Sequence, residues 1–328
     1  MKVLYIGGTG EISYSCLQAS AKAGHQCTVF NRGHSEEPLP DLVRQIVGDL
    51  NDREAFAQLA RENFDVVCQF LAYKMADIDR DVETFAGRVG QYVFISTASA
   101  YQKPPGKHII TEDTPLENPY WPYSRTKAEM EGRLMKYHGE KKIPVTIVRP
   151  SHTFRRRFPG TMVSGDLNAA RIEQGRPIIV PGDGTALWTL THSTDFAVPF
   201  VKLLGNEKAI GEAFHVTSDG VYTWDEIFRT VGKALDAEAK IVHVPTDTLI
   251  RYRPEWTGPL LGDKAWSTMF DHTKLKGIVG PLPKPKPLAD RFAKIVPYYR
   301  ERTKTMAVDR ETHDLLDRII ADQEKLGR

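Results

Sequence analysis

The chain has 328 residues, enough for one large domain and a smaller one with a substantial buried core. Its 44 lysines and arginines nearly balance its 42 aspartates and glutamates. The resulting formal charge of +2 does not indicate a nucleic-acid or membrane surface. No apolar run reaches ~18 residues, so we expect no membrane span and no membrane partner.

The chain begins with an apolar strand, residues 2–6, that stops at the turn Gly7-Gly8-Thr9-Gly10-Glu11-Ile12-Ser13. A stretch with helical spacing follows, and this order brings backbone N–H groups close to a pyrophosphate at a helix N-terminus. Ser13 replaces the usual third glycine and is small enough to keep the packing. We therefore predict dinucleotide binding here, although a bare glycine turn is the plain alternative. The residues expected around the cofactor are Gly7, Thr9, Gly10, Glu11 and Ile12.

The end of the second strand, residues 26–30, indicates which nicotinamide cofactor binds. An NAD site normally carries an acidic residue here for the ribose 2′-hydroxyl, but this chain has Asn31 and Arg32. The planar, permanently charged guanidinium suits a 2′-phosphate, unless it is only a solvated loop residue. We therefore expect NADP(H) to be favoured over NAD(H).

Two later strand ends are expected to complete the cofactor site. Asp49 and Leu50 follow a predicted third strand, and the Asp49 carboxylate could reach the adenine. Leu71 and Ala72 follow a fourth strand, residues 65–70, as a turn that could lie near the nicotinamide half. The carboxyl ends of parallel strands meet at one edge of a sheet, where such ligands bind.

Tyr123 and Lys127 lie four residues apart on a predicted helix, so their side chains share one face. A lysine ammonium is expected to stabilise the phenolate and lower the tyrosine pKa from ~10 toward physiological pH. A phenol of that kind suits proton donation to a carbonyl oxygen. The spacing is common by chance, so its meaning depends on the glycine turn before it.

Three cysteines, Cys16, Cys27 and Cys68, fall in predicted helix and strand positions. This odd, sparse set without paired spacing predicts reduced core thiols, with neither a disulfide nor a metal site. Residues 2–6 already form a core strand, so a signal peptide is not expected. We therefore expect a cytoplasmic protein.

The order of these motifs resembles that of the extended short-chain dehydrogenases/reductases, the group that includes the NAD-dependent epimerase/dehydratase family. The similarity spans about residues 1–236. Beyond it, residues 260–264 and 270–274 look similar to the branch of the chloroplast stem-loop-binding proteins. The segments that carry the family resemblance are 7–10, 48–50, 94–101, Tyr123 with Lys127, 148–150, 181–184, 191–197 and 211–216.

The alternation of strands and helices predicts an α/β fold with a doubly wound parallel sheet. The resemblance implies a Rossmann domain over residues 1–150 plus about 190–216. A smaller, discontinuous substrate-binding domain would then comprise residues 151–189 and 217–328. It also implies that a homodimer could form through the helix that carries Tyr123.

The resemblance implies roles for three residues. Thr97 would hydrogen-bond the substrate oxygen, with Ser96 and Ser99 as rival hydroxyls. Tyr123 would be the general acid/base, and Lys127 would bind the nicotinamide ribose. Pro150, in the motif after the sixth strand, would also contact the cofactor.

The departures from the family concern the substrate. No acidic pair follows Thr97, so dehydratase chemistry is not expected, and the usual diphosphate clamp cannot be identified. Trp188 could form a flat wall beside a ring or belong to the core. Arg155, in a run of three arginines, could hold a phosphate or carboxylate or be solvated. The candidate substrate contacts are Tyr73, Ser99, His152, Arg155 and Trp188.

Two enzymatic reactions and one binding function remain open for this chain. The first is net hydride transfer at a carbonyl or alcohol carbon of a sugar-like or other small substrate. The second is epimerisation of a sugar or nucleotide sugar through transient oxidation. The third, RNA binding on the same scaffold, is disfavoured by the balanced charge and by the absence of an aromatic RNA-binding stretch.

Overall fold

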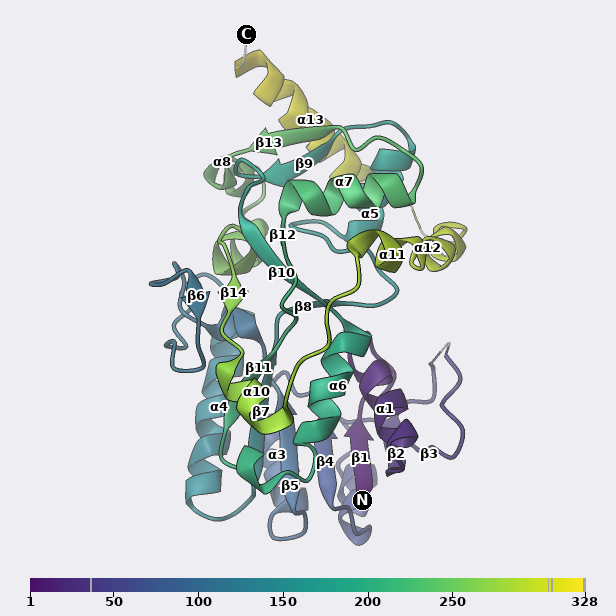
Figure 1. The fold of residues 1–328 in the computed structure, drawn as a ribbon, viewed down its shortest axis with the longest axis vertical. Helices are drawn as coiled ribbons and strands as arrows, with labels where there is room; N and C mark the ends of the chain where they lie inside the picture. The colour runs from purple at the N-terminus through teal and green to yellow at the C-terminus, as the bar shows by residue number, and fades with distance from the viewer. Residues whose placement is uncertain (36, 306, 308, 327–328) are drawn as a thin grey trace.

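The computed structural model describes residues 1–35, 37–305, 307 and 309–326 (Figure 1). A seven-stranded parallel sheet lies at the N-terminal end, in the order β11-β7-β5-β4-β1-β2-β3. The predicted doubly wound α/β fold is thereby confirmed. The strands are β1 (Lys2–Ile6), β2 (Gln26–Asn31), β3 (Arg44–Val47), β4 (Val66–Gln69), β5 (Gln91–Ile95), β7 (Val145–Pro150) and β11 (Ala213–Val216).

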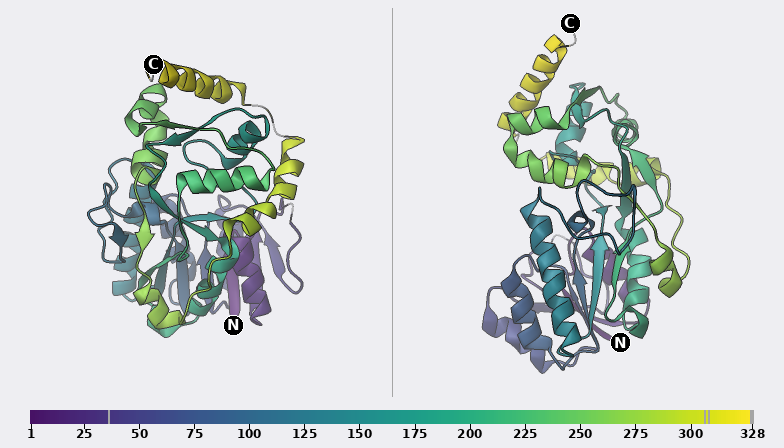
Figure 2. Two further views of the ribbon diagram at one scale, coloured as in Figure 1. Left: turned by 45° about the horizontal axis from the view of Figure 1, so that its top comes forward. Right: turned by 90° about the vertical axis from the view of Figure 1, so that its left-hand side faces the viewer.

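Successive residues of the strands point into two separate cores. Val3 and Tyr5 of β1 face a core that includes α1 (Ser13–Lys22) and α6 (Ser193–Leu203). Leu4 and Ile6 face the other core, with α2 (Arg53–Ala57), α3 (Met75–Phe85) and α4 (Pro122–Gly139). Both faces are therefore covered, as Figure 2 shows, and this explains why the central strands β1, β4 and β5 are mostly apolar and buried.

The chain leaves the sheet after β7 and returns with β11, whose Ala213 pairs with Ile147. The proposed division into two domains stays a prediction. The packing differs from that division in one helix, α10 (Thr273–Val279), because its Leu275 and Val279 pack in the core beneath α1 and α6. Residues 273–279 thus belong with the sheet, although the sequence placed them in the substrate-binding part.

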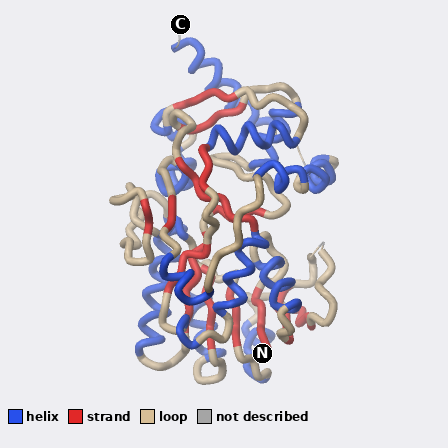
Figure 3. The backbone as a smooth tube through the Cα atoms, viewed as in Figure 1, coloured by secondary structure: helices blue, strands red, loops and turns tan. Residues whose placement is uncertain are grey.

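The rest of the chain builds smaller layers above the sheet (Figure 3). One is a three-stranded sheet of β12 (Val221–Thr223), β10 (Leu187–His192) and β8 (His152–Phe154). Two further sheets pair β13 (Ile241–Val244) with β9 (Ile178–Pro181), and β14 (Met269–Phe270) with β6 (Ile109–Ile110). The helices here are α5 (Gly165–Glu173), α7 (Trp224–Ala234), α8 (Thr246–Tyr252), α9 (Thr257–Pro259), α11 (Leu288–Ala293), α12 (Val296–Thr303) and α13 (Arg310–Leu326).

A π-helical segment, η5 (Leu260–Lys264), continues directly from α9. Its last two residues lie near the carboxyl ends of the large sheet's strands.

Of the helices that the structure describes, none is both long enough and apolar enough to cross a bilayer.

Candidate active site

Two adjoining cavities open at the carboxyl edge of the large sheet. We call the first, of about 420 Å³, the inner cavity. The second, of about 740 Å³, is the outer cavity. The inner lining includes Gly7, Gly10, Glu11, Ile12, Leu71, Tyr73, Ser96, Thr97, Ser99, Trp121, Tyr123, Lys127, Pro150, His152, Asp263 and Lys264. The outer lining includes Gly7, Thr9, Gly10, Glu11, Asn31, Arg32, Glu37, Asp49, Leu50, Leu71, Tyr73, Arg155, Arg156 and Arg302.

Nearly all the predicted site residues therefore converge on one continuous cleft. Gly7, Gly10, Glu11, Leu71 and Tyr73 line both cavities and so lie where the two meet. The two predicted residues outside both linings are Ala72 and Trp188.

The glycine turn between β1 and α1 is closed by a side chain. The Ser13 hydroxyl donates to the Gly7 carbonyl (2.6 Å) and accepts from the Gly10 N–H (2.9 Å). Gly7 has a φ of +84°, and a Cβ there would lie 2.4 Å from Leu71 Cγ. The sequence suggested that Ser13 was merely small enough to be tolerated. Its hydroxyl instead forms the hydrogen bonds that shape the turn.

Asn31, at the end of β2, presents an available donor at the outer cavity. Its Oδ1 accepts from Gly33 N–H (3.0 Å) and from Gln45 Nε2 (2.7 Å). Its buried Nδ2 has no partner within the described part of the chain. A buried amide without a partner is costly, and a ribose or phosphate oxygen at this strand end would satisfy it. The residues present therefore fit a dinucleotide.

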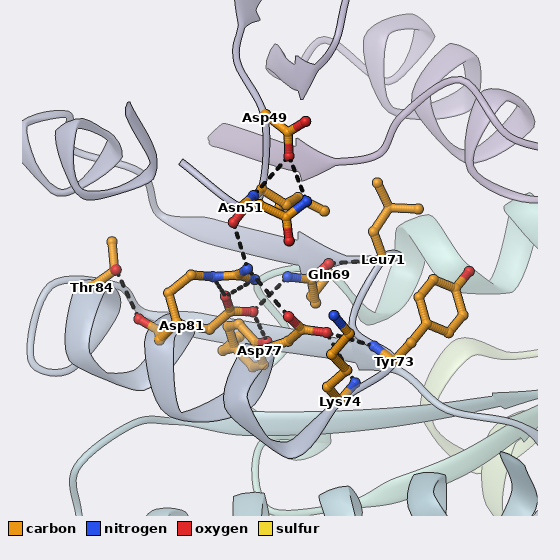
Figure 4. Close-up of polar contacts among 12 residues, drawn as sticks. Asp49, Asn51, Gln69, Leu71, Tyr73, Lys74, Asp77, Asp81 and Thr84 are labelled. Atoms are coloured by element: carbon orange, nitrogen blue, oxygen red, sulfur yellow. Dashed lines mark hydrogen bonds and ion pairs between the residues drawn. The ribbon is translucent and has the colours of Figure 1, made fainter. Parts of the chain in front are cut away.

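A buried ionic network supports the loops around the outer cavity (Figure 4). The fully buried Asp81 carboxylate accepts from Gln69 Nε2 (2.5 Å), from the Tyr92 hydroxyl (2.6 Å) and from Arg80. Arg80 also donates to the Leu50 carbonyl (3.0 Å). The Gln69 side chain accepts from Leu71 N–H (2.7 Å). One buried carboxylate thus orders both cofactor-side loops, those around Leu50 and Leu71.

Arg155 does not lie where the sequence placed it. It forms a bidentate pair with Glu37 (2.8 and 2.5 Å) and stacks over the Tyr14 ring at 4.9 Å. It lines the outer cavity, whereas Tyr123 lines the inner one. The expectation of an Arg155–substrate contact is wrong, because the chain after β8 turns toward the β2 side, where Glu37 holds the guanidinium.

Tyr123 and Lys127 both enter the inner cavity from the first turns of α4, which begins at Pro122. The buried Lys127 Nζ donates to the carbonyls of Ala72 (2.8 Å) and Ile95 (2.9 Å). Ala72 therefore holds the lysine in place and does not line the cleft. Because an ammonium has three N–H donors, one remains for another partner. Burial lowers the pKa of Lys127 to about 8.

The expected lowering of the Tyr123 pKa is wrong for this structure. Burial, followed by the neighbouring Tyr73, raises the pKa of Tyr123 to about 12, while the Thr97 hydroxyl acts in the opposite direction. Lys127 Nζ lies 6.0 Å from the centre of the Tyr123 ring and is directed at two carbonyls. The phenol is consequently protonated at neutral pH.

The three candidate hydroxyls differ in their surroundings. Thr97 Oγ1 lies 2.9 Å from Ser99 Oγ, which in turn lies 2.7 Å from Ser124 Oγ. Ser96 Oγ is buried and, among the described residues, has no partner. Sequence reasoning missed Ser124, although its place beside Tyr123 on α4 was a usable signal. Ser99 is engaged on both sides, and Thr97 Oγ1 also accepts from Ser99 N–H (3.2 Å), so Thr97 and Ser96 remain the hydroxyls of the inner cavity that could face a substrate.

His152 lines the inner cavity as a neutral ring. Burial, aided by Lys264, lowers its pKa to about 3, and its Nδ1 accepts from Trp188 Nε1 (3.2 Å). Trp188 is buried and stacks on Trp224 at 5.2 Å. The interpretation of Trp188 as a substrate wall is therefore wrong, because the indole belongs to the core behind His152. The indole that does line the inner cavity is that of Trp121, beside Tyr73 and Tyr123, and its role could not be predicted from the sequence.

The fold and the site together define a nicotinamide-dependent enzyme of the short-chain dehydrogenase/reductase superfamily. A dinucleotide-shaped cleft meets a tyrosine–lysine–threonine cluster at the carboxyl edge of a parallel sheet.

Comparison with known proteins identifies the family. The family model described as "NAD dependent epimerase/dehydratase family" matches residues 3–217. The chain belongs to the NAD dependent epimerase/dehydratase family, and it is an NAD(P)-dependent enzyme.

Two curated relatives and one solved structure show how far the similarity extends. The chain is 28% identical over 265 residues to chloroplast stem-loop binding protein of 41 kDa b from Arabidopsis thaliana. That match covers 74% of this chain but only 65% of the relative, less than two thirds of its length. The chain is also 26% identical over 281 residues to 2′-dehydrokanamycin reductase from Streptomyces kanamyceticus. This second match covers 83% of this chain and 77% of the reductase.

The solved structure is UDP-glucuronic acid 4-epimerase from Bacillus cereus in complex with NAD. It superposes with a TM-score of 0.74 at 20% identity, over 94% of this chain and 99% of the epimerase. At this level of identity the likeness concerns the fold.

Proposed function

We propose that this chain is an NADP(H)-dependent oxidoreductase that acts on a carbonyl or alcohol carbon of a small polar substrate. The observation that carries the proposal is the meeting of Tyr123, Thr97 and Lys127 in a cavity continuous with the dinucleotide cleft. A protonated phenol, a hydroxyl and an ammonium are the groups that carbonyl reduction requires.

Each of these residues has a separable task in the reduction. Thr97 hydrogen-bonds the substrate oxygen, which holds the carbonyl over the cleft. A reduced nicotinamide, held by the Gly7–Gly10 turn and Lys127, would supply the hydride for the carbonyl carbon. As the new C–H bond forms, the π electrons of the carbonyl move onto oxygen, and that oxygen takes the Tyr123 proton. The phenolate left on Tyr123 regains a proton from solvent, while the remaining N–H of Lys127, beyond those given to the Ala72 and Ile95 carbonyls, would hold the nicotinamide ribose.

The cofactor would lie across both cavities. The Gly7–Gly10 turn would receive the pyrophosphate, and the unpartnered Asn31 Nδ2 would donate to the adenosine half. Arg32 lines the outer cavity beside Asn31. Neither of these two residues at the end of β2 is acidic. This arrangement supports NADP(H) over NAD(H), since a guanidinium matches a 2′-phosphate.

Epimerisation is the second candidate, because the same three residues would serve transient oxidation of a sugar carbon. The similarity in fold to UDP-glucuronic acid 4-epimerase supports this alternative. The two reactions differ in the cofactor's fate, since an epimerase recycles bound NAD(P) and a reductase exchanges it at each turnover.

The expected cytoplasmic location and the homodimer through α4 stay predictions.

RNA binding is the third candidate function. The name of the Arabidopsis relative motivates the RNA question. An RNA site neutralises several phosphates with lysines and arginines, and its affinity therefore depends on salt. Because the formal charge of this chain is only +2, we expect no salt-sensitive RNA affinity in a filter-binding titration.

The experiment that tests the proposal identifies the nicotinamide and then removes the proton donor. Protein is purified and denatured, and any released dinucleotide is identified. Thermal shifts with NADPH and NADH are then compared on protein without bound cofactor. NADPH-selective stabilisation, with loss of turnover but not of cofactor affinity in Tyr123→Phe, is the expected result. Copurified NAD⁺ would favour epimerisation, and full turnover in Tyr123→Phe would overturn the proposed chemistry.

A further inference from the structure

Two residues of η5 form part of the inner cavity's wall, far along the chain from the predicted catalytic residues. Asp263 and Lys264 both line the cavity and form an ion pair of 3.2 Å. Their side chains are only 16% and 13% exposed, so this pair is not an ordinary solvated surface bridge. Residues 260–264 belong to the resemblance described above, but the sequence predicts no role for them.

The backbone of η5 is pinned to the rest of the site. The Asn118 side-chain amide donates both to the Ser99 carbonyl and to the Gly262 carbonyl, each at 2.7 Å. Trp224 Nε1 donates to the Lys264 carbonyl (3.2 Å). One asparagine therefore ties η5 to the loop that carries Thr97, which fixes the distance between the two.

Trp121 is the second contact that holds this segment. A Cβ at Gly258 would lie 2.6 Å from Trp121 Cδ1, and one at Gly262 would lie 2.8 Å from Trp121 Cβ. The indole thus packs directly on the glycine backbone. Its ring centre is 5.2 Å from that of Tyr123, while Lys264 Nζ lies 5.6 Å from it. A flat aromatic surface therefore lies next to both the Tyr123 ring and the Lys264 ammonium.

The charges in the inner cavity limit what can bind there. The described lining contains the ammonium groups of Lys127 and Lys264 and the carboxylates of Glu11 and Asp263. His152 adds no charge, because its pKa is lowered to about 3. The cations and anions balance, so the inner cavity offers no net positive charge to a diphosphate on the substrate.

We propose that Asp263, Lys264 and Trp121 form a specificity site for a polyhydroxylated ring that carries no phosphate. This inference rests on the proposed function, whose hydride acceptor it describes. A ring hydroxyl can donate to the Asp263 carboxylate while its neighbour accepts from the Lys264 ammonium. The apolar face of the ring stacks on Trp121. The substrate is thus a free cyclic polyol or its ketone, and a nucleotide-linked sugar is selected against.

The test measures binding of three probes to the NADP⁺-loaded protein by calorimetry and saturation-transfer NMR. The probes are myo-inositol, D-glucose and UDP-glucose. At least one free ring should bind more tightly than UDP-glucose. Asp263→Asn and Lys264→Met should each weaken it about tenfold or more, the size of one charge-assisted hydrogen bond. Lys264→Arg should retain part of the affinity.

The matched control is Lys325→Met, which breaks an exposed lysine–aspartate pair of 3.1 Å on α13 and should leave probe affinity unchanged. The inference is overturned if neither free ring binds, if UDP-glucose binds best, or if the two η5 substitutions change affinity less than twofold. NADP⁺ affinity, measured in every variant, separates the two ideas. Failure of the wild-type protein to bind NADP⁺ would sink the proposed function itself.

Discussion

Replacing Asp81 by alanine should be among the most damaging single changes outside the cleft. The carboxylate is fully buried and accepts four hydrogen bonds, from Gln69 (2.5 Å), from Tyr92 (2.6 Å) and two from Arg80 (3.0 and 2.7 Å). Its removal leaves the Gln69 and Tyr92 donors buried without this acceptor and leaves Arg80 only its longer ion pair with Asp77 (3.4 Å). Breaking such a pair costs about 3–5 kcal/mol.

The assay is urea unfolding followed by circular dichroism, with Asp79→Ala as the control on the same helix. Asp79 pairs with Arg133 at 3.5 Å, both side chains are about 40% exposed (38% and 41%), and the carboxylate also accepts from the Tyr137 hydroxyl (3.0 Å). An exposed pair contributes about 0–1 kcal/mol. Asp81→Ala should also weaken NADPH binding, since Arg80 and Gln69 hold the loops at the outer cavity. Equal loss of stability in the two variants would refute the argument from burial.

Three further predictions concern the cleft. Ser13→Ala should raise the NADPH dissociation constant several-fold in a fluorescence titration, because the turn loses both hydrogen bonds at Gly7 and Gly10; unchanged affinity would count against that role. Arg155→Met should raise the KM for NADPH and spare that of the substrate, and the reverse result would restore the original interpretation. Lys127 has its pKa lowered to about 8 from 10.5, so the cost of its buried ammonium is present below pH 8 and is relieved toward pH 10.5. The unfolding free energy of the wild type should therefore rise through that window relative to Lys127→Met, and parallel pH profiles would contradict this.

The regular part of the fold could be predicted because local patterns encode it. Most strands of the large sheet are short, largely apolar runs, and α1 and α4 carry helical spacing. Parallel strands must present their carboxyl ends at one edge. That rule alone gathers Gly7, Asn31, Asp49 and Thr97 around one cleft.

The errors share one cause, which is that burial and partner choice are properties of the whole molecule. The spacing of Tyr123 and Lys127 is correct, but burial raises the pKa of the tyrosine, and two backbone carbonyls bind the lysine. Trp188 and Arg155 have side chains suited to a substrate. One became core and the other paired with Glu37, which lies 118 positions away.

The amino-acid sequence by itself determined the strands of the parallel sheet, the glycine turn and the shared helix face of Tyr123 and Lys127, because each depends on neighbours within a few residues. Only the tertiary structure decided which charges are free and which wall faces the phenol. Asn118 and Trp121 hold the segment that carries Asp263 and Lys264 at the inner cavity. Their contacts with Gly262 join segments more than 100 positions apart. No local pattern encodes such a contact, since it exists only once both segments have packed.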